Sequence, residues 1–389
     1  MEYQELKECA KYSNLRTSTF TKDTYISTEN MLPNKGGVTS IDSIPTCKTM
    51  AKYEPADILI SNIRPYFCKI WFATREGGCS NDVLVIKTKK ELYPRFLYYV
   101  LSDKNFFNYA TITSKGTKMP RGNKNAIMKY LVPKISPVTQ QKIASILSVY
   151  DRLIESNTRR IRLLEQMAEN LYKEWFVRFR FPEHENIEMV NRLPKGWKRT
   201  KLIKNIKTSS GGTPSRNKGE YYKNGTIPWI KTGELQDCIL INTEECITED
   251  AVNNSSAKLF PKGTLLMSMY GVNVGKLGIS EIEATCNQAC CVFTPKHIDY
   301  KYYLFHYLKS IREYLLSISF GAAQQNLSQE LIKSIRVLFP DEETNISFVK
   351  EVQPLFKEIS IIQQQNQLLT RQRDLLLPRL MSGKLEVKS

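Results

Sequence analysis

Ile58-Leu59-Ile60-Ser61 is matched further along the chain by Leu265-Leu266-Met267-Ser268, and the match continues without a gap through Val85 and Val292. The separation is constant, since 268−61 and 292−85 both give 207 residues. A period this long exceeds the roughly 20–50 residues of solenoid repeats. The sequence therefore predicts two similar domains rather than a stack of small repeats, and two similar domains suggest a target in two parts.

Each copy has the pattern of a mixed α+β domain. In the first copy, short apolar runs at Ala56 to Ile60 and Asp82 to Ile86 predict strands. Glycine-containing segments at residues 34–37 and 76–78 predict turns, and a helix is expected from Pro94 to Leu101. We place the first domain at residues 1–138 and the second at residues 191–342.

Two long helices are predicted after the two domains, at residues 139–176 and 344–377, within helical regions 139–190 and 343–389. Residues 139–176 contain neither proline nor glycine, and one helix of this length would extend about 57 Å. We expect Pro378 to end the second helix, and Pro354 is compatible with that helix only at a start or a bend. Residues that are apolar except for two asparagines recur at heptad spacing in two columns per helix, as in a coiled coil. The columns are Ile143, Tyr150, Asn157, Leu164 and Leu171 with Ile146, Leu153 and Met167 in the first helix, and Val352, Ile359 and Asn366 with Leu355, Ile362, Leu369 and Leu376 in the second.

Asn157 and Asn366 each interrupt one of these apolar columns near the middle of its helix. A buried asparagine costs stability but fixes register. We therefore expect the helices to pair antiparallel with these residues setting the alignment, although either amide could instead face solvent.

The composition favours a folded protein with a polyanionic partner. Of 389 residues 41% are hydrophobic, and 56 Lys and Arg outnumber 39 Asp and Glu, for a net charge of +17. Such a charge attracts nucleic acid, although charge alone fits an ordinary basic protein equally well. No run of about 20 apolar residues is present, so we expect a cytoplasmic protein without a membrane span.

Catalytic and metal motifs are weak in this sequence. The segment from Gly271 to Leu277 resembles a phosphate-binding loop, but it has the wrong glycine spacing and lacks the hydroxyl that would bind magnesium. Cys286, Cys290 and Cys291 lack zinc-ligand spacing, and a strand core explains them better. We find no amino-methyltransferase or nuclease motif, so we expect no catalysis and no metal or cofactor in this chain.

Several ordered motifs together resemble the specificity subunit of type I restriction-modification systems. They are Gly211-Gly212-Thr213-Pro214-Ser215, Ile227-Pro228-Trp229-Ile230, Lys173-Glu174-Trp175-Phe176 with Arg178, and the tail from Arg373 to Leu385. The resemblance implies two target-recognition domains, each reading half of an asymmetric DNA site, and two antiparallel coiled-coil helices that separate them. It further implies docking of two methyltransferase subunits, and of restriction and translocase subunits, in a bacterial or archaeal cell. S-adenosylmethionine, ATP and Mg²⁺ would be bound by those partners.

DNA contacts are expected on loops between strands, because base readout needs exposed donors and acceptors and phosphate contacts need cations or amides. The cationic runs could equally be solvated surface, and Trp229 is better explained as core. The candidates in the first domain are Arg64, Tyr66, Lys115, Lys118 and Arg121. The candidates in the second domain are Thr213, Ser215, Arg216, Tyr270, Asn273, Lys276, Gln324, Gln325 and Asn326.

Two other functions compete with a non-catalytic recognition subunit. A self-sufficient methyltransferase or nuclease is disfavoured by the missing motifs. A stand-alone DNA-binding or scaffold protein without enzyme partners remains open from the residues alone. Helices of fixed length would also act as a spacer, so inserting a helical turn is expected to change the preferred gap between half-sites.

Overall fold

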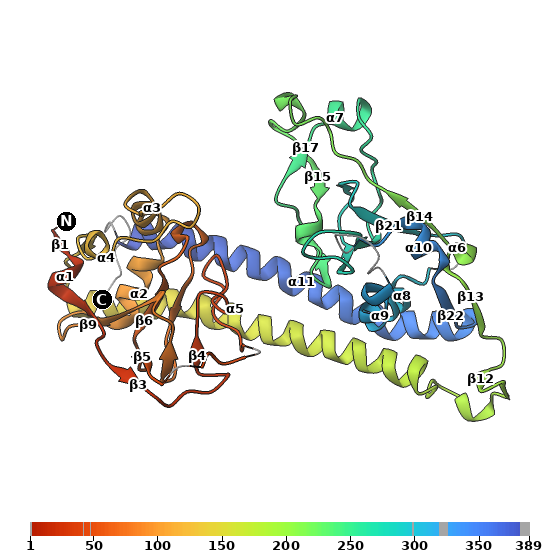
Figure 1. Cartoon of the computed structure of the whole chain (residues 1–389), viewed down its shortest axis with the longest axis horizontal. Coiled ribbons are helices and arrows are strands. Elements are labelled where there is room, and N and C mark those ends of the chain that lie inside the picture. Colours follow the sequence, from red (N-terminus) through yellow and green to blue (C-terminus); the bar gives the residue numbers. More distant parts are fainter. Residues whose placement is uncertain (1, 42, 47, 298, 319–325, 382–389) are drawn as a thin grey trace. The chain divides into compact units, whose positions relative to one another are not determined.

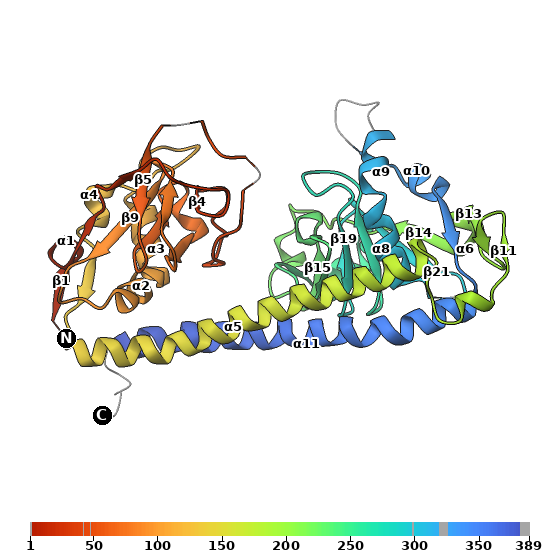
Figure 2. The ribbon, with the colours of Figure 1, turned by 90° about the horizontal axis from the view of Figure 1, so that it is seen from below.

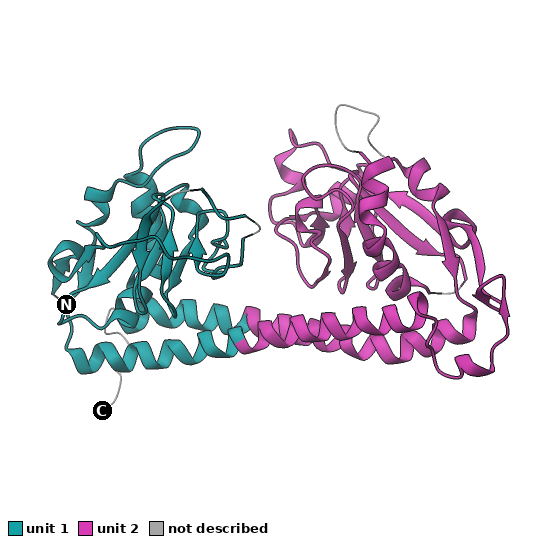
Figure 3. Cartoon of the chain, turned by 60° about the horizontal axis from the view of Figure 1, so that its bottom comes forward, with its two compact units in different colours: residues 1–155, 368–389 teal, residues 156–367 magenta. Residues whose placement is uncertain are grey.

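The computed structural model describes residues 2–41, 43–46, 48–297, 299–318 and 326–381, and Figures 1 and 2 show its elements in two views. The chain divides into two compact units, coloured separately in Figure 3. Unit 1 comprises residues 1–155 and 368–389, and unit 2 comprises residues 156–367. The long helices α5 (Pro137–Tyr172) and α11 (Glu342–Met381) contribute to both units, whereas the sequence assigned each helix to a region of its own. Those domain boundaries stay a prediction.

Unit 1 is built on two four-stranded sheets, in the orders β2-β9-β6-β7 and β3-β5-β8-β4, with β1 and β10 paired apart from them. Its strands are β1 (Tyr3–Glu5), β2 (Ala10–Tyr12), β3 (Arg16–Thr17), β4 (Tyr25–Ile26), β5 (Met50–Tyr53), β6 (Ile58–Ser61), β7 (Ile70–Phe72), β8 (Gly77–Cys79), β9 (Val83–Thr88) and β10 (Leu131–Pro133). Its shorter helices are α1 (Leu6–Cys9), α2 (Pro94–Ser102), α3 (Lys104–Ile112) and α4 (Lys124–Ile127).

Unit 2 has a five-stranded sheet in the order β14-β21-β18-β19-β16, a three-stranded sheet β17-β15-β20, and the pairs β13-β22 and β11-β12. Its strands are β11 (Met189–Val190), β12 (Leu193–Pro194), β13 (Lys198–Lys201), β14 (Ile206–Ser210), β15 (Ile227–Ile230), β16 (Cys238–Leu240), β17 (Cys246–Ile247), β18 (Leu265–Ser268), β19 (Leu277–Ser280), β20 (Thr285–Cys286), β21 (Cys290–Pro295) and β22 (Arg336–Phe339). Its shorter helices are α6 (Leu202–Asn205), α7 (Glu249–Asn253), α8 (Lys301–Ser310), α9 (Arg312–Ile318) and α10 (Gln329–Ser334).

The two copies found in the sequence fold into two equivalent sheets. In unit 1, Ile58 of β6 lies opposite Ile86 of β9, and in unit 2, Leu265 of β18 lies opposite Phe293 of β21. Each of the two unit 2 residues follows its unit 1 counterpart by the same 207 positions in the sequence. The two sheets therefore share their strand register as well as their strand order. This result, with a mixed helix and sheet structure in both units, confirms the predicted α+β class.

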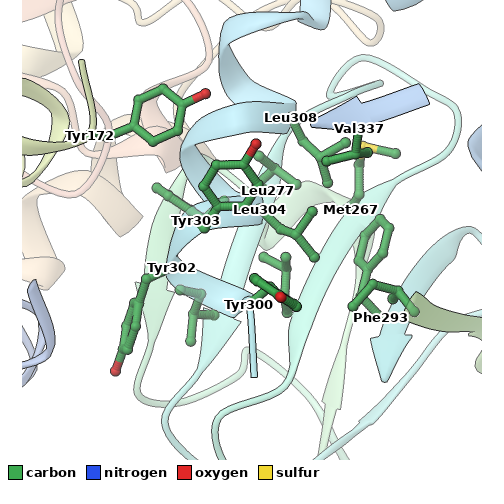
Figure 4. Packing of buried hydrophobic residues seen from close by; sticks show 14 of the residues in the cluster. Tyr172, Met267, Leu277, Phe293, Tyr300, Tyr302, Tyr303, Leu304, Leu308 and Val337 are labelled. Atoms are coloured by element: carbon green, nitrogen blue, oxygen red, sulfur yellow. The ribbon is translucent and has the colours of Figure 1, made fainter. Parts of the chain in front are cut away.

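The core of unit 2 joins the sheet to the helices. α8 carries an almost continuous buried run because one face meets the sheet and another meets α5 and α11. Figure 4 shows Leu304 and Leu308 of α8 beside Met267 and Leu277 of β18 and β19. The five-stranded sheet of unit 2 is therefore packed, through α8, on the helical segments of the same unit.

Within each unit, α5 and α11 lie side by side and antiparallel. In unit 2, Asn157 Nδ2 donates to Asn366 Oδ1 at 2.9 Å, and Arg160 pairs with Glu358 at 2.9 Å. The partner number in α11 falls as the number in α5 rises, which is the expected antiparallel direction. The sequence also placed both amides correctly in the helix interface, while their role in setting register stays a prediction.

One predicted column of α5 is wrong at two of its three positions, whereas its first residue, Ile146, packs against the core of unit 1. Leu153 and Met167 are 47% and 55% exposed, whereas Leu147 and Ala168 are buried, so the inward column is displaced by one residue. A helix turns every 3.6 residues, and neighbours at three- and four-residue steps share a face. A heptad pattern in the sequence therefore cannot show which of two adjacent positions faces the core.

The predicted end of α11 is also wrong. The helix continues past Pro378 to Met381, and it begins well before Pro354, at Glu342. Both prolines are exposed. Each removes one backbone hydrogen bond and crowds the preceding turn, a local cost that the rest of this long helix offsets.

Candidate nucleic-acid interface

The two equivalent hairpins carry equivalent loops, which we call loop A (residues 62–69, between β6 and β7) and loop B (residues 269–276, between β18 and β19). Each loop begins with the same hydrogen bond at 3.0 Å, from Ser61 Oγ to the Ile63 carbonyl and from Ser268 Oγ to the Tyr270 carbonyl. The loops therefore share a backbone path and differ in the side chains that they carry.

Left-handed backbone conformations recur at the same two positions of both loops. Arg64 and Cys68 have φ values of 50° and 52°, and the corresponding Gly271 and Gly275 have φ values of 90° and 77°. Only glycine adopts such angles without strain. The glycines that resemble a phosphate-binding loop are thus explained by the turn of loop B.

The structure brings the five candidates of unit 1 together on two adjacent segments. Lys115 and Arg121 exchange backbone hydrogen bonds of 2.9 Å, and the Arg64 amide donates to the Pro120 carbonyl at 2.8 Å. Tyr66 is 48% exposed at the tip of loop A. Lys118 and Lys115 are exposed on the second segment, so the candidates form one cationic surface with a single aromatic ring.

Arg121 is already engaged by an acidic neighbour. Its guanidinium lies 3.3 Å from Asp82 Oδ1, in an exposed ion pair that contributes little to stability. Such a pair can exchange its carboxylate for a phosphate, and Arg121 remains a candidate.

In unit 2, a residue that the sequence analysis missed connects two candidate segments. The Gln288 side chain accepts a hydrogen bond from Thr213 and is also hydrogen-bonded to Tyr270. Ser215, two residues beyond Thr213, is exposed. Gln288 has no distinctive sequence context, because it lies in a turn before β21, and only the fold shows that it lies beside loop B.

Several unit 2 candidates are occupied by contacts within the protein. The Asn273 side-chain amide donates to the carbonyls of Thr232 and Gly233 at 3.0 and 3.1 Å. These bonds use its donor group and leave its side-chain oxygen as the acceptor. Lys276 lies 3.5 Å from Asp237 Oδ2. In this geometry Asn273 can accept from a base but cannot bind adenine through two hydrogen bonds.

Arg216 is held by three neighbours. Its guanidinium lies 4.2 Å from the Tyr222 ring centroid and 4.9 Å from that of Trp229, and it pairs with Glu245 at 2.8 Å. The hydrogen bond from Arg216 lowers the pKa of Glu245, and Lys231 contributes as well. Trp229 itself is buried, which confirms its predicted place in the core.

The last candidate segment follows α9. Gln324 and Gln325 lie outside the described residues. Asn326 is exposed, and the next residue, Leu327, donates its amide to the Met269 carbonyl at 2.8 Å. Asn326 therefore lies beside loop B, as Thr213 does through Gln288, whereas the contacts of Arg216 lie with Tyr222, Trp229 and Glu245 outside that loop.

Within the described ranges, no group of three or more His, Cys, Asp or Glu side chains is placed to hold a metal ion. The cysteines of the same ranges are free thiols, and burial raises the pKa of Cys291 to about 12. Among the helices that the structure describes, none is long and apolar enough to cross a membrane.

A family model, the type I restriction modification DNA specificity domain, matches residues 3–166 and 194–371. The chain belongs to this family. The two matched segments correspond to the two copies seen in the sequence and in the sheets. Members are specificity subunits, which recognise DNA sequence and have no catalytic activity of their own, and this confirms that the chain is not an enzyme.

Curated relatives agree with this assignment, and a solved structure agrees with the fold. The MjaIX specificity subunit of Methanocaldococcus jannaschii is 28% identical over 308 residues, which cover 77% of this chain and 71% of the relative. The HindI specificity subunit of Haemophilus influenzae is 25% identical over 432 residues, covering 93% and 94%. The crystal structure of a type I S subunit from M. genitalium matches with a TM-score of 0.57 and 16% identity, over 100% of this chain and 96% of that one. At this identity the structure bears on the fold alone.

Proposed function

We propose that this chain reads an asymmetric, two-part site on duplex DNA, one part with each unit. The observation that carries the proposal is the pair of equivalent hairpins with different side chains. Loop A has Arg64 and Tyr66 where loop B has Gly271 and Asn273. The same backbone with different donors and acceptors suits two different base sequences.

Electrostatics supports a DNA target. The chain carries a net charge of +17, and exposed Lys115 and Lys118 lie beside loop A. Cations on exposed loops neutralise phosphates and give binding without sequence preference, whereas side chains on the loops supply the preference.

The helical segments support docking of protein partners. Large apolar residues remain exposed on α5 and α11 of both units: Val149, Leu153, Leu368 and Leu375 in unit 1, and Leu163, Met167 and Ile361 in unit 2. A docked partner would cover these exposed apolar side chains. We infer two methyltransferase subunits there, with restriction and translocase subunits, in the cytoplasm of a bacterial or archaeal cell. S-adenosylmethionine, ATP and Mg²⁺ would be held by these partners.

Selection of binding sites tests the proposal. The full chain, with its co-expressed methyltransferase partner, would select fragments from a library of randomised duplex DNA, and sequencing would reveal the recovered motif. We expect two short specified segments with an unspecified gap between them. One uninterrupted motif, or no enrichment, would contradict the proposal.

Co-purification separates this function from that of a stand-alone DNA-binding protein. A tagged chain expressed from its own host should recover a methyltransferase in a fixed ratio. Recovery of the chain alone, with the same DNA motif, would favour the stand-alone alternative.

A further inference from the structure

Lys35 connects loop A to helix α11 within unit 1. Its Nζ lies 3.0 and 2.9 Å from the two carboxylate oxygens of Asp374 on α11. The Lys35 side chain is 12% exposed and that of Asp374 is 31% exposed, so the pair is largely withdrawn from solvent. Partial burial makes such an ion pair stronger and more specific in geometry than a surface pair.

The backbone at Lys35 is bonded to loop A. The Asn34 amide donates to the Phe67 carbonyl at 2.8 Å, and the Lys35 amide donates to the Cys68 carbonyl at 3.0 Å. Asn34 and Lys35 are both left-handed, with φ values of 53° and 62°. Asparagine adopts this conformation readily, whereas lysine does so at a cost that the surrounding contacts must offset.

The ion pair extends across both helical segments of unit 1. Arg373 pairs with Asp374 at 3.0 Å and with Asp151 of α5 at 2.7 Å, and the Tyr99 hydroxyl donates to Asp151 at 2.6 Å. Burial alone would raise the pKa of Asp374, but Arg373 and Lys35 outweigh it and hold that pKa below its usual value. A continuous network therefore joins α5, α11 and loop A.

Loop B is held differently at the same point. The Gly275 carbonyl, which corresponds to that of Cys68, accepts from Arg312 Nε at 2.8 Å. Arg312 pairs in turn with Asp237, which also contacts Lys276. Arg312 belongs to α9, and Asp237 precedes β16. These contacts of loop B therefore lead to α9, whereas those of loop A lead through Lys35 to α11.

We propose that Lys35 is a positioning residue for DNA recognition, whose ion pair with Asp374 makes the geometry of loop A depend on the helical segments of unit 1. A partner that shifts these segments would then change how unit 1 reads its half-site. The inference rests on the proposed function, because it presumes that loop A reads DNA.

The test replaces Lys35 by methionine, which keeps the length of the side chain and leaves the backbone bond to Cys68 possible. Site selection from randomised duplex DNA would use the full chain with its methyltransferase partner. We expect discrimination between bases to fall roughly five- to hundredfold at one half-site, the cost of losing one well-placed base contact. The other half-site should be unchanged, and Lys35→Arg, which keeps the charge, should retain wild-type discrimination at the affected one.

A matched control comes from the same unit. Lys52 pairs with Glu54 at 3.2 Å and with Glu76 at 3.1 Å, and neither partner belongs to loop A. Lys52→Met should leave the discrimination between bases at both half-sites as it is in the wild type. Should Lys35→Met unfold, Asp374→Asn removes the same ion pair. Because Asp374→Asn also removes the pair with Arg373, adding a folded Lys35→Met to it should have no further effect.

The outcomes are distinguishable. If the wild-type chain selects no sequence, the proposed function fails. If it selects two half-sites and both Lys35→Met and Asp374→Asn select them equally well, or both lose the two half-sites together, only the role of Lys35 is overturned.

Discussion

A buried histidine shows how a single side chain ties stability to pH. His306 is 4% exposed, and its ring stacks on Tyr172 at 5.4 Å. Burial, with a smaller contribution from Lys309, lowers its pKa from 6.5 to about 3. Between these values the unfolded chain binds a proton that the folded chain does not, so stability decreases as pH falls through this window.

Replacing His306 by phenylalanine should remove that pH dependence. The wild type is expected to lose at most about 1.4 kcal/mol of unfolding free energy per pH unit between pH 6 and 4 through this group. Urea unfolding at pH 7 and pH 5 measures the loss. His184→Gln, at an exposed position, should keep the wild-type difference, and an equal difference in His306→Phe would contradict the assignment.

The turn of loop B makes a second prediction at this scale. A Cβ added to Gly271 would meet no atom within 4 Å, so its only obstacle is the φ value of 90°. Gly271→Ala should therefore destabilise unit 2 by about 1–2 kcal/mol. Gly233 is equally open but does not have a left-handed φ, and Gly233→Ala should be close to neutral in the same unfolding measurement.

At the scale of elements, leucine variants of Asn157 and Asn366 measure how much this pair contributes to stability, independently of its predicted role in helix register. Asn157→Leu alone leaves the Asn366 amide without its partner, which costs about 1–3 kcal/mol. Replacing both by leucine should recover that cost and exceed wild-type stability, because two apolar residues pack better in the interface. Chemical denaturation of the two single variants and the double variant tests this order; a double variant weaker than both single variants would contradict it.

The elements also show what the sequence could and could not predict. β6 and β18 were found because both copies repeat an apolar strand ending in serine, and α5 because residues 139–176 lack helix breakers. The sheet containing β4 and β8 was missed, since a two-residue strand paired in parallel has no periodic signature. The turn predicted at residues 76–78 is wrong, because Gly77 and Gly78 belong to β8. The Lys35–Asp374 pair joins residues far apart in sequence, and no local pattern indicates such a contact.

For the whole molecule, the positive charge should control affinity more than specificity. Binding should weaken as salt increases, because DNA contacts release counterions. Lys115→Ala should lower affinity for all sequences and reduce the slope of log affinity against log salt by about one, with the selected motif unchanged. Fluorescence anisotropy on specific and random duplexes measures both quantities, and a changed motif would show that Lys115 reads bases instead.

The shared register of the two hairpins has a practical consequence. Because loops A and B begin and end at matching backbone positions, either loop can be grafted between the two strands that flank the other. A library that exchanges or recombines these short segments would vary chemistry on an unchanged support. New half-site preferences could then be obtained without redesigning the scaffold beneath them.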